Sequence, residues 1–253
     1  MDAFLIETIF DTLNAKAAIE ACQTVMRRRG IELPVMLSVT VSDLAGRTLS
    51  GQTLDAFLAS VSSLGIFSVG LNCSFGASQM RPYIEELAAK APYYISAYPN
   101  AGLPNEMGAY DETPESMAPQ IAEFIDEGLV NIIGGCCGTT PDFIARYAQM
   151  AEGKKPHVVT QRPQYMWLSG LDLLQVDDHV HAPIDSSRFV NVGERCNVAG
   201  SRKFLRLINE KSYEEALGIA RKQVADGAAV VDVYMDDGLL DAKAEMVNFL
   251  NMI

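Results

Sequence analysis

The unit that decides the fold is Leu129-Val130-Asn131-Ile132-Ile133-Gly134-Gly135-Cys136-Cys137-Gly138-Thr139-Thr140-Pro141. It begins with a continuous apolar run, Leu129–Gly134, which is typical of a parallel strand covered on both faces. A glycine-rich turn follows, and Thr140-Pro141 then places an N-cap residue before a proline at the first helical position. The stretch therefore predicts a β-strand, a turn and the start of an α-helix.

The same strand–turn–helix unit recurs toward the N-terminus. Four earlier apolar runs are strand candidates: Phe4–Ile9, Pro34–Val41, Ile66–Asn72 and Tyr93–Tyr98. Thr113-Pro114 repeats the helix start between the fourth and fifth strands. Five such units in succession predict an α/β fold with a parallel sheet. The sheet is either doubly wound or part of a (β/α)8 barrel, which needs eight units to close.

The pattern changes toward the C-terminus. Prolines, histidines and paired acidic residues appear without a helical period, which is typical of a linker, with some β character around Tyr165–Leu168. Strands are predicted again at Phe189–Val192 and Ala229–Val233, and Ser212-Tyr213-Glu214-Glu215 has the pattern of a capping box. The predicted parts are a domain of residues 1–152, a linker of residues 153–188 and a domain of residues 189–253. Two strands do not make a stable sheet alone, so we expect the last domain to be cut off.

Composition excludes several classes of protein. The net charge of −12 repels phosphate backbones, so nucleic-acid binding is not expected. No apolar run approaches the ~18–20 residues that span a bilayer, and the N-terminus lacks a positively charged leader region. Five cysteines, two of them adjacent, fit a reducing cytoplasm and favour metal binding or thiol chemistry over disulfides.

Three of the cysteines follow predicted strands. Cys73 follows the third strand, and Cys136 and Cys137 follow the fifth, so all three are expected at the carboxyl ends where α/β proteins build their sites. Three thiolates can hold one Zn²⁺ and leave its fourth position open, as in catalytic zinc sites. A substrate thiol in that position would lose its proton and become a nucleophile.

The spacing of these cysteines leaves two other interpretations open. Free cysteines are often buried as small apolar side chains. The adjacent pair Cys136 and Cys137 could also form a strained vicinal disulfide. A mixed Cys/His site has no local source of ligands, because the first 150 residues contain no histidine.

The motifs around the cysteines resemble those of the homocysteine S-methyltransferase family. The matching runs are Leu5-Ile6-Glu7-Thr8, Gly70-Leu71-Asn72-Cys73 and Gly134-Gly135-Cys136-Cys137-Gly138-Thr139-Thr140-Pro141. The resemblance implies a (β/α)8 barrel in which Cys73, Cys136 and Cys137 hold zinc and the zinc binds the thiol of homocysteine. It also implies that Glu7 helps to hold the amino acid end of the substrate. The alternative for Glu7 is a carboxylate that favours the start of the following helix.

The second domain carries a motif of its own. The run Phe189-Val190-Asn191-Val192-Gly193-Glu194-Arg195-Cys196-Asn197-Val198-Ala199-Gly200-Ser201 resembles the first strand and loop of the folate-binding barrel of cobalamin-dependent methionine synthases. The resemblance implies folate contacts from Glu194, Asn197, Gly200, Ser201 and Arg202. Alternatively, Asn197 and Ser201 are only turn and helix-cap residues. The sequence departs from the family at Tyr234, where an asparagine is usual and where the bulkier ring would crowd the folate site.

Together the resemblances imply the C-terminal part of a homocysteine-binding (β/α)8 barrel, linked to the first βα units of a pterin-binding (β/α)8 barrel. The implied reaction is that of methionine synthase, in which a methyl group passes from 5-methyltetrahydrofolate through cobalamin to zinc-bound homocysteine. No catalytic residue is expected beyond the metal site. Cobalamin would be bound by a domain absent from this chain, so we expect the isolated chain to be inactive.

Two rival functions remain at the level of sequence. One is a cobalamin-independent homocysteine S-methyltransferase that takes its methyl group from betaine or S-methylmethionine. The other is a zinc-binding fragment without turnover. The folate-type motif of the second domain argues against the first rival, because such an enzyme does not need a folate barrel.

Overall fold

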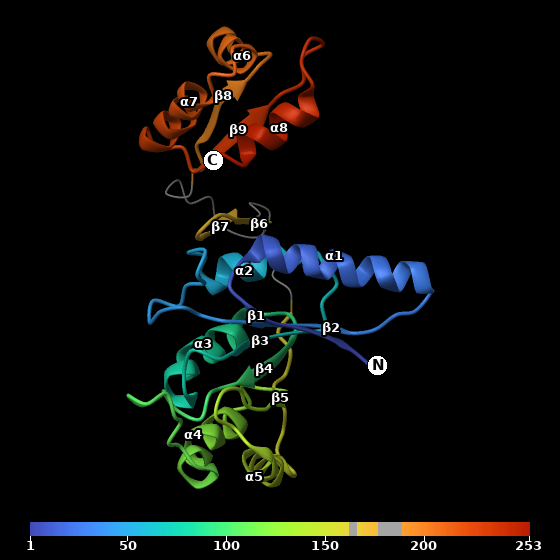
Figure 1. Cartoon of the computed structure of the whole chain (residues 1–253), viewed down its shortest axis with the longest axis vertical. Coiled ribbons are helices and arrows are strands. Elements are labelled where there is room, and N and C mark those ends of the chain that lie inside the picture. The colour runs from blue at the N-terminus through green and yellow to red at the C-terminus, as the bar shows by residue number, and fades with distance from the viewer. Residues whose placement is uncertain (162–165, 177–188) are drawn as a thin grey trace. The chain divides into compact units, whose positions relative to one another are not determined.

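The computed structural model describes residues 1–161, 166–176 and 189–253 (Figure 1). Its internal contacts divide the chain into two compact units, Met1–Asp178 and His179–Ile253. Tyr165 and residues 177–188, which belong to the predicted linker, lie outside the described residues. No helix in the described part of the chain is both long and apolar enough to cross a bilayer.

The first unit is built on a five-stranded parallel sheet. Its strands are β1 (Phe4–Ile9), β2 (Val35–Val39), β3 (Ser68–Asn72), β4 (Tyr94–Tyr98) and β5 (Ile132–Ile133). Its helices are α1 (Thr12–Arg29), α2 (Leu54–Val61), α3 (Ala77–Lys90), α4 (Pro114–Asp126) and α5 (Pro141–Ala151). All five strands predicted for this part of the sequence are confirmed, and β2, β3, β4 and β5 are shorter than predicted.

The order of the strands decides between the two predicted architectures. They lie side by side as β1-β2-β3-β4-β5, in the order of the sequence. A doubly wound sheet would reverse its order at a switch point, whereas a barrel wall keeps the order of the chain. Figure 1 shows the helices following one another in the same order, from α1 to α5. The first unit is therefore a run of barrel wall, and the described strands do not close it.

The two faces of the sheet differ in chemistry. One face carries aliphatic side chains in register, such as Leu37 beside Val69 and Val69 beside Ile95, and these belong to the core shared with the helices. The opposite face carries small and polar residues, among them the fully buried Ser38 and Ser96. In a closed barrel this second face would be the interior. The three cysteines lie beyond the carboxyl ends of the strands that form this face.

Strands β3 and β4 approach each other closely at Gly70. A Cβ atom added to Gly70 would lie 1.9 Å from the carbonyl oxygen of Ser96 and 2.1 Å from its Oγ. The strand pairing runs through the same two residues, Gly70 beside Ser96. Only glycine fits at this position, because the obstructing atom belongs to the backbone and cannot rotate away.

A β-hairpin follows the fifth helix and packs on α2. It consists of β6 (Met166–Ser169) and β7 (Leu173–Val176), which pair antiparallel. Ser169 Oγ donates to the Ala56 carbonyl at 2.7 Å, and Thr53 N donates to the Leu171 carbonyl at 2.9 Å. The sequence had indicated only some β character here. The contacts join the hairpin to the first unit.

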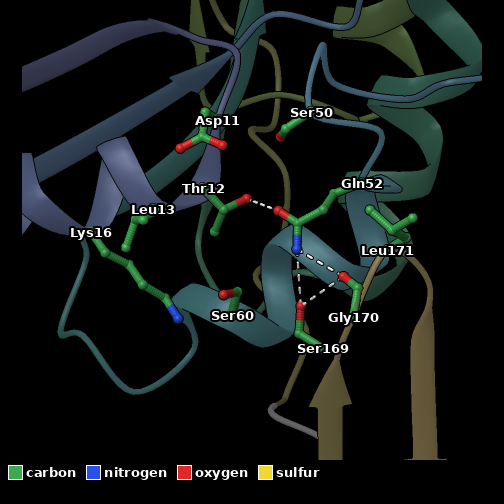
Figure 2. A pocket seen from close by; sticks show the side chains of 10 residues that line it. All are labelled: Asp11, Thr12, Leu13, Lys16, Ser50, Gln52, Ser60, Ser169, Gly170 and Leu171. Carbon is green, nitrogen blue, oxygen red and sulfur yellow. Dashed lines mark hydrogen bonds between the residues drawn. The ribbon is translucent and has the colours of Figure 1, made fainter. Parts of the chain in front are cut away.

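A cavity of about 330 Å³ lies between the hairpin turn and the start of α1 (Figure 2). Gln52 crosses it, with its amide bonded to the Gly170 carbonyl at 2.8 Å and its oxygen accepting from the Thr12 hydroxyl. None of the cysteines and none of the predicted substrate contacts line this cavity. The hydrogen bonds of the residues that line the cavity hold the hairpin against the rest of the first unit. The cavity is therefore not the predicted site.

The second unit is a small α/β layer. It contains β8 (Val192–Asn197), α6 (Arg202–Asn209), α7 (Tyr213–Ala225), β9 (Val230–Tyr234) and α8 (Ala242–Leu250), with β8 and β9 parallel. Phe204 and Phe249 meet edge to face at 5.3 Å in its core. Glu245 is buried and is held by an ion pair with Lys211 and by the Tyr213 hydroxyl at 2.7 Å.

Two predictions for the second unit are wrong in detail. The first strand was expected at Phe189–Val192, but it runs over Val192–Asn197. Glu194 and Arg195 within it are exposed, so the strand lacks the apolar pattern by which covered strands are predicted. Ser212 does precede α7, but its side chain makes no cap hydrogen bond. Its ψ of 59° departs from the extended backbone of a typical N-cap.

We predict that Gly70→Ala destabilises the first unit by about 3 kcal/mol, because β3 and β4 must separate to admit the new methyl group. Urea unfolding followed by circular dichroism would measure the change. Gly170→Ala is the matched control in the same unit, since its added Cβ would have no neighbour nearer than 3.8 Å. Equal stability of the two variants would contradict the close approach at Gly70.

Candidate metal centre

Three cysteines from two loops converge at the carboxyl end of the sheet. Cys73 directly follows β3, and Cys136 and Cys137 lie in the turn between β5 and α5. The Sγ atoms of Cys73 and Cys137 are 3.4 Å apart, and those of Cys136 and Cys137 are 3.9 Å apart. All three lie within 4.8 Å of one another, and they form the cluster of potential metal ligands found in the described residues.

These separations fit a tetrahedral zinc site. With a Zn–S bond of ~2.3 Å, the edge between two sulfurs of a tetrahedron is ~3.8 Å. The measured 3.4 Å and 3.9 Å lie on either side of that value. A disulfide would require ~2.05 Å, so the vicinal bond between Cys136 and Cys137 is not formed here. The three cysteines are also only half-buried, unlike Cys196, so burial as simple core residues does not describe them.

The backbone aims the first ligand by an unusual conformation. Cys73 and Ser74 have φ values of 63° and 60°, in the left-handed region that residues with a side chain seldom adopt. The conformation is fixed on both sides of Cys73. Its N–H donates to the Tyr98 carbonyl at 3.2 Å, and its carbonyl accepts from Phe75 N at 2.7 Å.

The loop after β4 holds the cysteine pair. Cys136 N donates to the Pro99 carbonyl at 2.9 Å, and Cys137 N donates to Asn100 Oδ1 at 3.1 Å. Gly138, with φ of 80°, ends the turn, and a Cβ added to it would lie 2.4 Å from Cβ of Tyr110. The turn therefore needs glycine at this position, because Tyr110 lies directly against it.

The thiols of Cys73 and Cys137 affect each other's ionisation. Burial, and after it the hydrogen bond with Cys137, raise the pKa of Cys73 to about 12. The hydrogen bond from Cys73, followed by one from the Tyr110 hydroxyl, lowers the pKa of Cys137. The same contact therefore shifts the pKa values of Cys73 and Cys137 in opposite directions. A bound cation favours the thiolate form of its sulfur ligands.

Glu7 lies in β1 on the face opposite the helices, next to the left-handed Thr8, and its side chain is exposed. Asp11, not Glu7, caps α1, since its side chain accepts from Asn14 N at 2.8 Å. Glu7 therefore is not the capping carboxylate of the following helix. Burial first, and to a smaller extent the charge of Glu7, raise the pKa of Tyr98.

The predicted folate contacts surround the end of β8. Glu194 lies within the strand rather than after it, where it pairs with Arg195 at 3.0 Å, and Asn197 is the last residue of the strand. Asn197 Oδ1 accepts from Gly200 N at 2.8 Å, and Ser201 caps α6 by accepting from Phe204 N at 3.2 Å. These are the turn and cap contacts of the alternative interpretation, and they also fix the loop that carries Arg202.

Tyr234 lies beside this loop. It ends β9, pairs with Asn197 in the strand register, and is 40% exposed. Tyr234 is therefore the neighbour of Asn197, one of the predicted folate contacts, in the adjacent strand.

Three polar residues of the metal centre were not assigned a role from the sequence. Asn72, Asn100 and Tyr110 contact Cys136 or Cys137. The sequence contains one indication of a role for Asn72, because it is a polar residue at the end of an apolar strand, directly before a candidate ligand. Asn100 and Tyr110 lie in a loop distant in sequence from both cysteine motifs, so only the fold reveals their contacts.

The fold and the cysteine cluster define a parallel α/β protein with a thiolate site for a metal at the carboxyl ends of its strands. Residues 1–151 match the family of homocysteine S-methyltransferases, and residues 193–253 match the pterin binding enzymes. The chain belongs to the homocysteine S-methyltransferase family. A pterin-binding domain follows its homocysteine S-methyltransferase domain, which is consistent with a methionine synthase-like architecture. The cysteine triad is consistent with zinc as in that family.

We predict that the purified chain binds about one zinc ion and that Cys136→Ser loses it, because a hydroxyl is a poor substitute for a thiolate ligand. Zinc content would be measured by atomic absorption after dialysis against a weak chelator. Cys22→Ser is the matched control, since Cys22 is also free and half-buried but lies on α1. Equal zinc in wild type and Cys136→Ser would contradict the assignment.

Proposed function

We propose that this chain activates homocysteine on a zinc ion held by Cys73, Cys136 and Cys137, as part of a methionine synthase. The observation that carries the proposal is the convergence of three half-buried sulfurs within 4.8 Å, with two of their separations, 3.4 Å and 3.9 Å, close to a tetrahedral edge. Three protein ligands leave a fourth position for a substrate, which is the arrangement of catalytic rather than structural zinc.

Zinc bound there would make a coordinated substrate thiol lose its proton at neutral pH and so supply a thiolate nucleophile. The chain's own residues would orient that thiol. Glu7, in the second half of β1, would bind the amino group of homocysteine through a charge-assisted hydrogen bond. Holding both ends of the substrate presents its sulfur in a fixed direction, which lowers the entropic cost of the transfer.

The methyl donor is proposed to be 5-methyltetrahydrofolate, bound by the second unit. The pterin-binding match supports this, and Glu194, Asn197, Gly200, Ser201 and Arg202 are the proposed contacts. Cobalamin as the carrier between the two substrates is the finer part of the hypothesis. Cobalamin would be held by a separate cobalamin domain that acts as a partner of this chain. None of the described residues is assigned to cobalamin binding. A cytoplasmic location stays a prediction from the cysteine content.

A cobalamin-independent transfer from betaine or S-methylmethionine is the second candidate. It is disfavoured because it gives no role to residues 193–253, which match a pterin-binding family. A zinc-binding fragment without turnover shares the metal site but predicts no selective binding of either substrate. Ligand binding by each unit therefore separates the three functions.

For the first unit, we predict that homocysteine binds to the Co²⁺-substituted chain and strengthens its sulfur-to-metal charge-transfer absorption, whereas homoserine does not. Glu7→Gln should weaken homocysteine about 10-fold, because a hydrogen bond to a charged group contributes ~1.5–3 kcal/mol. Glu32→Gln changes an exposed carboxylate beyond α1 and serves as the control. Equal spectral responses to homoserine and homocysteine would exclude thiol coordination.

For the second unit, we predict that Tyr234→Asn strengthens binding of 5-methyltetrahydrofolate several-fold, because it removes a ring beside Asn197. Arg202→Ala should weaken binding, because it removes a proposed folate contact. Arg202 is exposed, so the substitution leaves the fold intact. Calorimetry would measure both affinities, with Tyr94→Asn as control, a tyrosine of similar exposure (42%) in the first unit. Binding of betaine instead of the folate would favour the second candidate function.

A further inference from the structure

We infer that Asn72 is a positioning residue that fixes the metal ligand Cys136 and the end of β1 relative to each other. The inference rests on the proposed zinc site. Asn72 is the last residue of β3 and is only 2% exposed. A polar side chain so deeply buried needs partners for both its oxygen and its nitrogen.

The amide oxygen of Asn72 binds two neighbouring strands. Oδ1 accepts from the backbone N–H of Thr8 at 3.0 Å and from the hydroxyl of Ser38 at 2.7 Å. The pairing of β1 with β2 is irregular between Ile6 and Ile9, and Thr8 has a left-handed φ of 59°. Asn72 thus supplies the acceptor for a backbone N–H at the point where the strand register shifts.

The amide nitrogen then faces the metal centre. A backbone N–H can only donate, so the oxygen of Asn72 must be the atom near Thr8 N, and this settles the orientation of the amide. Nδ2 consequently donates to Thr8 Oγ1 at 3.0 Å and lies 4.0 Å from Sγ of Cys136. One amide group therefore contacts the residue after Glu7 and a proposed zinc ligand.

This arrangement has an electrostatic consequence for the metal-bound state. Three thiolates and one Zn²⁺ carry one net negative charge, which an adjacent N–H dipole stabilises. Partners in the outer shell of a metal site orient the ligands, and their mutation typically costs 10- to 100-fold in affinity. Asn72 would in addition keep the sulfur at a constant distance from Glu7, which is proposed to hold the other end of the substrate.

The test is the isosteric change Asn72→Asp. The carboxylate keeps an acceptor for Thr8 N and Ser38 but replaces the donor facing Cys136 with an oxygen that repels the bound thiolate. We expect zinc affinity to fall about 10-fold and the charge-transfer band of the Co²⁺-substituted chain to shift. Zinc affinity would be measured by competition with a chromophoric chelator and the band by absorption spectroscopy.

Asn131→Asp is the matched control. Asn131 is likewise a bridging asparagine, with Oδ1 accepting from Ile95 N and Nδ2 donating to the His157 carbonyl, each at 2.8 Å. It precedes β5, at the amino end of the sheet, away from the cysteines. A purely structural role would make the two variants alike, with reduced stability and an unchanged Co²⁺ spectrum.

A second variant, Thr8→Ala, approaches the link from β1 by removing the Oγ1 acceptor of Nδ2, and we expect a smaller band shift in the same direction. If Asn72→Asp does not fold, the spectrum of Thr8→Ala tests the inference in its place. Wild-type affinity and spectrum in the folded variants would overturn the inference while leaving the zinc site intact. Failure of the wild type itself to bind Co²⁺ or Zn²⁺ would instead overturn the proposed function.

Discussion

The metal centre depends on the parallel pairing of β3, β4 and β5. Neighbouring strands lie ~4.8 Å apart, so the ends of β3 and β5 are separated by about twice that distance with β4 between them. Their cysteine sulfurs nevertheless lie within 4.8 Å of one another. The gap is closed by the left-handed backbone at Cys73 on one side and by the glycine turn around Cys136 and Cys137 on the other. The carbonyls of Tyr98 and Pro99, at the end of β4, anchor both.

Much of the first unit could be predicted from the sequence, because β2, β3 and β4 are buried along most of their length and are therefore largely apolar. The same criterion failed for β8, whose exposed Glu194 and Arg195 do not mark a strand. It also gave only a partial indication of the β6–β7 hairpin, which is stabilised by contacts with α2 more than a hundred residues earlier. Such contacts leave no periodicity in the local sequence.

The candidate site divides in the same way. The three cysteines could be predicted as a group because parallel strands bring their carboxyl ends together. The distances that favour a metal over a disulfide or plain burial required the structure. The role of Asn72 also required it, since its partners Thr8 and Cys136 are each 64 residues away, in opposite directions along the chain. The match of residues 1–151 to the homocysteine S-methyltransferases and that of residues 193–253 to the pterin binding enzymes then identify the family of the first unit and a pterin as the kind of ligand expected for the second.

Cys73 and Ser74 both adopt left-handed backbone conformations, and these determine at which stage the free-energy cost of ordering the site arises. Such conformations cost ~1–3 kcal/mol each in residues with a side chain. Here that cost falls on the folding of the polypeptide, because backbone hydrogen bonds to β4 and Phe75 impose the geometry. The backbone at Cys73 thus directs its side chain toward the other two cysteines by contacts within the polypeptide alone. An ion held there as proposed would be lost and regained without rebuilding the loop, so such a site would recover quickly after transient depletion of metal.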